Sequence, residues 1–123
     1  QKAVPVGVGA MAALLGLEMP AVREIVGEVQ GNEIVSAAND NAFGQVVISG
    51  HKGAVEQAIT LAQAKGAKRA LLLPVSAPFH CALMQPAADV MRDALAAVNS
   101  QAPVTTLVAN VTADAVTDPA RIK

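Results

Sequence analysis

His80 is the residue of this sequence best placed for acid–base chemistry. It ends the run PVSAPFH, residues 74–80, after an expected strand and before an expected helix. Two prolines stiffen this loop, and loop positions with rigid flanks often carry catalytic groups. Because imidazole titrates near neutral pH, His80 could serve as a general base toward a hydroxyl or a thiol. An ordinary loop histidine fits the same position, so both interpretations stay open.

No nucleophile for His80 is evident in the sequence. Cys81 is adjacent, but neighbouring residues on a helix do not face one another, so we expect a buried, inert thiol there. The sequence also lacks the G-x-S-x-G elbow of serine hydrolases. We therefore expect the group that His80 activates to lie outside these 123 residues. His51 opens an expected helix, where we expect it to be neutral and solvated.

Two polar clusters and one methionine are further candidates. Asn39, Asn41 and Gln45 surround Gly44 and supply amide donors and acceptors, although turn formation alone would also explain them. The run KGAKR, residues 65–69, is the densest basic cluster. It is either a solvated helix end or a docking patch for an anionic partner. Met11 is most simply a core residue.

The composition excludes several classes of protein. The net charge is -1 and aromatic residues are only 2%, which argues against nucleic-acid binding. One cysteine and two histidines make a zinc site unexpected. No apolar run reaches about 18 residues, so we expect no membrane span. The chain begins without methionine or a signal-peptide pattern, which suggests part of a longer protein.

The hydrophobic pattern predicts an α+β fold. Strands are expected at 8–17, 33–38, 45–49 and 70–75, with a turn at 39–44, one helix from Pro20 to the stop at Gly31, and another at 51–65. This order is the βαββαβ, ferredoxin-like arrangement, closed within residues 8–75. We expect one sheet face to bury both helices through Val22, Ile25, Val26, Val29, Val55 and Ile59.

The remaining residues, 76–123, do not fit that sheet. A helix is expected at 84–98 and a strand at 105–111, followed by a polar tail. One helix and one strand cannot enclose a core, so their apolar faces need a partner that the chain lacks. We interpret this region as the edge of a second, incomplete subdomain.

Three motifs resemble one enzyme family: AVPVGVGAMAALLGL, NDNAFGQVVISG and GAKRALLLPVSAPFHCALMQPAAD. Their order and spacing are similar to the malonyl-CoA:acyl-carrier-protein transacylases of type II fatty acid synthesis and the related acyltransferase domains of polyketide synthases. Phe43 departs from the family's usual proline. The resemblance implies a ferredoxin-like subdomain inserted in a large α/β-hydrolase-like one. It also implies a cytoplasmic enzyme with malonyl-CoA and acyl carrier protein as partners, and with no cofactor or metal.

The resemblance also implies roles for individual residues. The family's catalytic base falls on His80, and its serine nucleophile and malonate-binding arginine would precede Gln1. Phe79 resembles the malonyl-preferring version of the motif, in which a ring fills the space of an α-methyl group. Met11, Asn39, Asn41 and Gln45 would contact substrate, and Lys68 and Arg69 would meet the carrier protein. The chain alone is then expected to be inactive.

Two other interpretations remain open. The chain could be a free-standing ferredoxin-like module that binds a regulatory small molecule, without catalysis. Such a module would leave no unmet apolar face after residue 80. It could also be a structural fragment whose only property is to fold.

Overall fold

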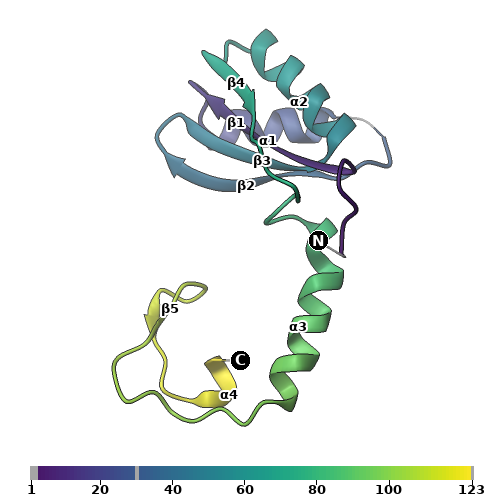
Figure 1. Ribbon diagram of the computed structural model, residues 1–123. Coiled ribbons are helices and arrows are strands. Elements are labelled where there is room, and N and C mark those ends of the chain that lie inside the picture. The colour runs from purple at the N-terminus through teal and green to yellow at the C-terminus, as the bar shows by residue number, and fades with distance from the viewer. Residues whose placement is uncertain (1–2, 30, 123) are drawn as a thin grey trace. The chain divides into compact units, whose positions relative to one another are not determined.

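The computed structural model describes residues 3–29 and 31–122 and has an α+β fold. By its contacts the chain divides into two units, the first ending at Ala87 and the second beginning at Ala88. The first unit contains the following elements (Figure 1): β1 Gly9–Leu15, α1 Met19–Glu28, β2 Val35–Ala42, β3 Gln45–His51, α2 Lys52–Ala64, β4 Arg69–Leu72 and the short 3₁₀ helix η1 Ala82–Met84.

The first unit is built on a four-stranded sheet with the strand order β2-β3-β1-β4, and each neighbouring pair is antiparallel. β1 is a central strand, paired with β3 on one side and β4 on the other. Its side chains alternate between the two faces, as the period of a strand requires. Ala12 and Leu14 are fully buried on one face, and Met11 lies on the other.

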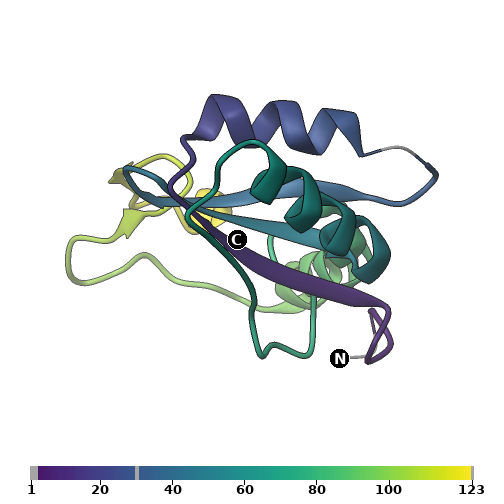
Figure 2. The same cartoon turned by 90° about the horizontal axis from the view of Figure 1, so that it is seen from above.

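Both helices cover the same face of the sheet (Figure 2), as the sequence pattern predicted. Val22 and Ile25 of α1 and Val55 of α2 are fully buried and pack with Leu14 and Ile48 in one core. Burial of each such side chain stabilises the fold by about 1.5–3 kcal/mol relative to exposure. The core contains aliphatic side chains only, consistent with the low aromatic content.

The segment expected as a long turn, 39–44, is instead mostly strand. β2 continues to Ala42, and only Phe43 and Gly44 form the turn into β3. The register between β2 and β3 shifts by one residue at Ala38 and again at Asn41, so each is the extra residue of a β-bulge. Bulges allow a strand to carry residues that fit the pleat poorly, which is why the polar composition misled the prediction.

The second unit departs further from expectation. Its elements are most of α3 Gln85–Ala97, then β5 Val108–Ala109, β6 Asp114–Ala115 and α4 Pro119–Ile122. The strand expected at 105–111 is only the two residues of β5, which pair with β6. The tail expected to be merely polar contains β6 and α4. So short a hairpin buries little surface, and an alternating apolar pattern does not suffice to extend it.

α3 spans residues 85–97, slightly less than the expected 84–98, and its apolar face stays largely uncovered by the described residues. None of its residues is buried. Val90 and Met91 are 70% and 58% exposed, and Val98, just after the helix, is 52% exposed. In the described ranges, no helix is both long and apolar enough to cross a membrane.

Candidate functional site

The loop between β4 and η1 carries His80 and is shaped by its prolines. Pro74 and Pro78 are each the central residue of a three-residue turn, closed by backbone hydrogen bonds of 2.8 and 3.1 Å respectively. Such turns need a φ close to the value that the pyrrolidine ring imposes. The two prolines therefore fix the path of the backbone toward His80.

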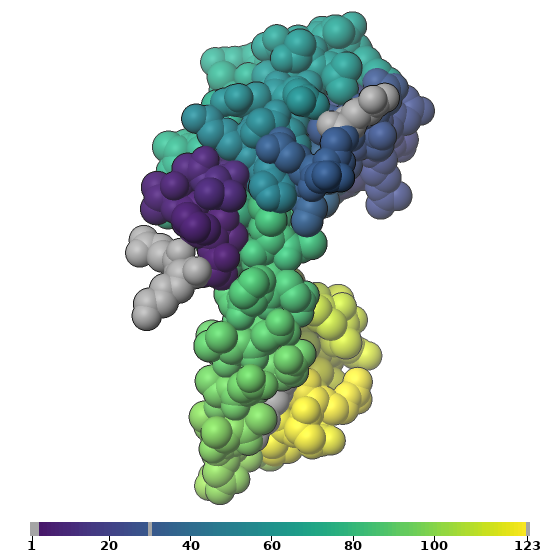
Figure 3. Space-filling view, turned by 90° about the vertical axis from the view of Figure 1, so that its right-hand side faces the viewer, coloured from purple at the N-terminus to yellow at the C-terminus, as the bar shows by residue number. Residues whose placement is uncertain are grey.

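β1 anchors this loop at two points. The N–H of Leu73 donates a hydrogen bond of 2.8 Å to the carbonyl oxygen of Met11. Gly9 packs against Pro78 so closely that an added Cβ would lie 2.4 Å from the proline Cγ. Pro78 is fully buried. In the space-filling view the purple N-terminal residues border the green segment that follows β4 (Figure 3). The central strand thus positions the loop.

His80 is exposed and has a φ of +58°. A positive φ is uncommon for residues other than glycine, and such outliers gather at functional sites. Among the residues that the structure describes, the imidazole has no hydrogen-bond or ion-pair partner. Its nitrogens are therefore free to exchange a proton with a group from outside the described chain.

Cys81 points its thiol back into the loop that precedes it. Its Sγ donates a hydrogen bond of 3.1 Å to the carbonyl oxygen of Pro78. The residue is half-buried, not fully buried as expected. Because this hydrogen bond engages the thiol with the backbone, Cys81 helps to shape the loop and is not aimed at His80.

Three of the other candidate residues share the sheet face opposite the helices. Met11 is buried on that face of β1. Asn39 pairs across the sheet with Val47, and Gln45 pairs with Leu15, which places both amides on the face of Met11. Asn41 is the extra residue of a bulge, so the register of the strands does not assign it to either face of the sheet. Neither hydrogen bonds nor ion pairs within the described ranges link His80 to these residues or to Phe79, which is 44% exposed.

The basic cluster separates into two parts with different surroundings. The Nζ of Lys65 lies 2.7 Å from a carboxylate oxygen of Glu28 and 3.6 Å from one of Glu24. The hydrogen bond that Lys65 donates to the Glu28 carboxylate is the main cause that raises the pKa of Lys65 above its ordinary value. Lys65 thus joins α1 to α2, as a structural residue would.

Lys68 and Arg69, in contrast, are exposed and form no ion pair with any described residue. The N–H of Lys68 donates 2.7 Å to the carbonyl oxygen of Leu15, and its side-chain stem lies against Gly16. Arg69 also pairs with Leu15 in the sheet, so it shares the face of Gln45. Both cations are available to an anionic partner.

His51 forms two hydrogen bonds that the sequence did not predict. Its Nδ1 accepts a hydrogen bond of 2.8 Å from the N–H of Ile34, and its own N–H donates 2.7 Å to the carbonyl oxygen of Ile34. His51 is half-buried, so the expectation of a solvated residue holds only in part.

Two features of the site were missed by sequence reasoning. The sequence did not indicate a role for Gly9, because its close contact with Pro78 joins residues far apart in the chain. Ser49 is fully buried opposite Met11, and its hydroxyl has no partner among the described residues. Only the register of β1 and β3 reveals that relation. In the same described part of the chain, no group of three or more potential ligands could hold a metal ion.

Comparisons with known proteins agree with the resemblance found in the motifs. No family model matches the chain. It is 48% identical over 123 residues to the malonyl CoA-acyl carrier protein transacylase of Salmonella typhimurium, covering all of this chain and 40% of that protein. The crystal structure of an acyl-carrier-protein S-malonyltransferase from Bartonella henselae is 56% identical, with a TM-score of 0.86, over 98% of this chain and 38% of that one.

A third similar structure includes a carrier protein. It is a malonyl-transacylase in complex with a type II polyketide synthase acyl carrier protein, 44% identical with a TM-score of 0.91, over 99% of this chain and 39% of that one. The chain thus spans about 40% of the length of the curated relative from Salmonella. These similarities confirm the resemblance to malonyl CoA-acyl carrier protein transacylases.

Proposed function

We propose that this chain is part of an acyltransferase that moves a malonyl group from coenzyme A to the phosphopantetheine thiol of an acyl carrier protein. The observation that carries the proposal is the placement of His80. It stands exposed at the end of a loop braced by two prolines, with an imidazole that no described residue engages. The similarity to malonyl transacylases over the whole chain supports the same function.

His80 acts as the general base in this proposal. It accepts the proton of a serine hydroxyl from outside the described chain while the serine oxygen attacks the malonyl thioester carbon. The carbon–sulfur bond then breaks, and His80 returns the proton to the departing sulfur of coenzyme A. In the second half of the reaction His80 takes the proton from the carrier thiol, whose sulfur attacks the malonyl-serine ester. Serine leaves with that proton.

The substrate is positioned by residues around His80. Phe79 precedes the base and limits the space beside it, which favours malonyl over a branched acyl group by about 1–3 kcal/mol per methyl. Met11 lies under the loop, because its carbonyl oxygen accepts the hydrogen bond from Leu73. Asn39, Asn41 and Gln45 offer amide groups to the thioester or the pantetheine arm.

Lys68 and Arg69 provide the surface that meets the carrier protein. Both cations are exposed and unpaired with any described residue, so no ion pair within the described chain must break when an acidic partner arrives. Their attraction acts mainly on encounter and weakens with salt. In the complete protein, charge reversal of both residues to Glu should raise the KM for carrier protein more than that for a small thiol acceptor.

The proposal extends to the architecture. Residues 8–75 form a ferredoxin-like subdomain, and residues 76–123 belong to the edge of a larger α/β-hydrolase-like subdomain in a cytoplasmic enzyme without cofactor or metal. The order β2-β3-β1-β4 and the two helices on one face support the first part. The exposed apolar face of α3 supports the second, and a free-standing binding module would not carry it.

The test is malonyl transfer by the complete protein. His80→Ala should slow acylation of the serine by about 10²–10⁴-fold, the range that loss of a general base costs. Ser76→Ala is the control in the same loop and should leave acylation nearly unchanged, because Ser76 is exposed. This chain alone should form no stable malonyl adduct. Malonylation of Cys81, detected by mass after incubation with malonyl-CoA, would contradict the assignment.

A further inference from the structure

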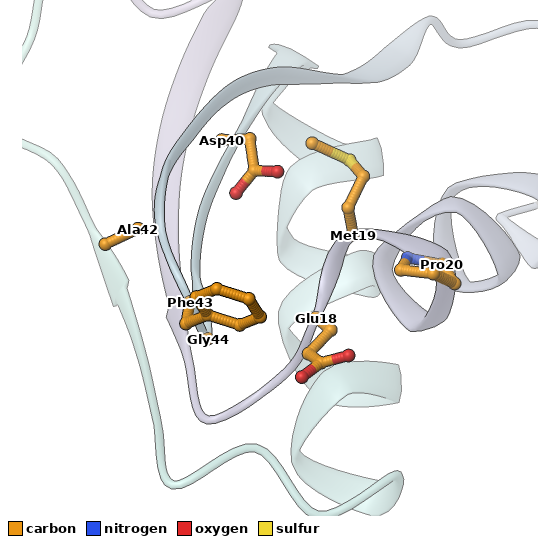
Figure 4. A pocket seen from close by; sticks show the side chains of 7 residues that line it. All are labelled: Glu18, Met19, Pro20, Asp40, Ala42, Phe43 and Gly44. Carbon is orange, nitrogen blue, oxygen red and sulfur yellow. The ribbon is translucent and has the colours of Figure 1, made fainter.

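A hollow of about 390 Å³ opens beside the turn between β2 and β3. Its lining residues Asp40, Ala42, Phe43 and Gly44 lie in the same stretch of chain as the proposed substrate-binding amides of Asn39, Asn41 and Gln45. Figure 4 shows Asp40 and Phe43 on one side of it, across from Glu18, Met19 and Pro20 at the start of α1. This volume is at the lower end of the range for small-molecule sites. The lining combines two carboxylates, one aromatic ring and an apolar wall.

The two carboxylates carry negative charge that no ion pair among the described residues neutralises. Neither Glu18 nor Asp40 forms an ion pair or a side-chain hydrogen bond with any described residue. Glu18 precedes α1 without capping it by a side-chain hydrogen bond. The positive end of the helix dipole offsets part of its charge, so Asp40 contributes more of the field in the hollow. An anionic ligand would be repelled.

The other lining groups decide which kind of cation fits. Phe43 is 97% exposed, so its ring is available to a ligand. An aromatic face attracts cations, and the side chains of Met19 and Pro20 provide apolar contact. Two carboxylates fall short of the six or more oxygens that bind a calcium ion. A hydrated metal ion would also make no use of the ring or of the apolar wall.

We propose that this hollow binds an organic cation, a guanidinium or alkylammonium group on a short apolar stem. The charged head lies between Asp40 and the Phe43 ring, and the stem lies along Met19 and Pro20. The proposal concerns cation binding in this hollow and does not rest on the acyl-transfer function. The cation could come from a free amine or from a basic side chain of a polypeptide.

The experiment titrates butylguanidinium chloride into the protein labelled with ¹⁵N-glycine. Gly44 lines the hollow, and its carbonyl oxygen accepts a hydrogen bond from the N–H of Gly16, so both amides report on the turn. We expect saturable shifts of these two signals. n-Butanol, which has the same stem without the charge, should give none. N-acetyl-arginine amide should bind more tightly if the source is a polypeptide, and equally if it is a free amine.

Variants assign the binding to the proposed groups. Asp40→Asn should weaken binding by about twofold to fivefold, and Glu18→Gln by less. Phe43→Leu keeps an apolar side chain without the ring and should cost about twofold to fivefold. Glu56→Gln on α2 removes the same charge far from the lining residues and should leave the Kd unchanged. Equal weakening by Glu56→Gln and Asp40→Asn, or binding of n-butanol as tight as that of butylguanidinium, would overturn the proposal.

Discussion

Ser49 is a single residue whose burial lowers the stability of the fold. It lies in the middle of β3 with no exposed surface, and its hydroxyl meets no partner among the described residues. Burial of a hydroxyl without a hydrogen bond costs about 1–3 kcal/mol. An apolar side chain of similar size would avoid that cost.

Ser49→Ala is therefore expected to stabilise the protein by about 1 kcal/mol, because it removes the unpartnered hydroxyl and leaves only a small void. Urea unfolding followed by circular dichroism measures the change. Ser36→Ala is the matched control, since Ser36 is the cross-strand partner of Ser49 on β2 and is only half-buried. A loss of stability in Ser49→Ala would mean that the hydroxyl has a partner outside the described chain.

At the scale of elements, the position of the His80 loop depends on β1. The strand holds the loop through the hydrogen bond from Leu73 to Met11 and through the contact between Gly9 and Pro78. The second contact is so close that a Cβ added to Gly9 would overlap the ring of Pro78. The strand and the loop must move together.

Gly9→Ala should lower malonyl transfer in the complete protein by at least tenfold, because a misplaced catalytic group loses its alignment with the substrate. The turnover number measures this. Gly27→Ala is the control. An added Cβ at Gly27 in α1 meets nothing within 4 Å, and alanine should stabilise the helix by about 0.5–1 kcal/mol without affecting turnover. Normal turnover in Gly9→Ala would show that the contact does not position His80.

The ion pairs of Lys65 join α1 to α2 and make a pH-dependent contribution to stability. Since the folded state raises the pKa of Lys65 above 10.5, the contribution is complete below that pH and is lost as the pH rises through the raised pKa. Lys65→Gln should be less stable than the parent near neutral pH, and the difference should vanish above the raised pKa. Urea midpoints measured from about pH 8 to about pH 12 test this.

Lys52→Gln provides the comparison for that series. Its Nζ lies 4.0 Å from Glu56 one helical turn away, and both side chains are more than half exposed. Such pairs contribute little. A difference between parent and Lys65→Gln that persists unchanged above the raised pKa would show that the ion pairs do not cause it.

The sequence predicted the helices and strands whose apolar side chains recur at a regular spacing. β1, α1, α2 and α3 appear where the apolar spacing predicted them. The apolar sides of α1 and α2 pack on the same face of the sheet. The sequence was not sufficient for the bulges of β2 or the two-residue β5, because pairing with a neighbouring strand determines these. For the site, the position of His80 after a stiff loop was predictable. Its positive φ and its anchoring by Gly9 follow from contacts between distant residues.

At the scale of the whole molecule, the two units differ in how they bury apolar surface. The first unit has a continuous core between one sheet face and two helices. In the second, Val116 is the one described apolar residue that is buried, while Val90 and Met91 of α3 and Val98 just after it are exposed. Exposed patches of this kind favour either partner binding or association between copies.

We expect residues 81–123 to be loosely packed, or exchanged with a second copy, when the 123-residue chain is studied alone. Amide hydrogens of α3 should exchange faster than those of β3, since no core protects the helix. Hydrogen exchange detected by mass, with the oligomeric state measured by sedimentation, tests this. Protection at Val90 to Leu95 equal to that of the sheet, in a demonstrated monomer, would contradict it.

The backbone conformation of His80 lowers the stability of the fold, whereas its imidazole is needed for the proposed catalysis. A left-handed conformation costs a histidine about 1–2 kcal/mol that a glycine would not lose. Variants selected only for resistance to heat should therefore accumulate glycine or asparagine at position 80. Variants selected for acyl transfer should keep the imidazole and acquire compensating substitutions elsewhere. Parallel selections would thus diverge at position 80.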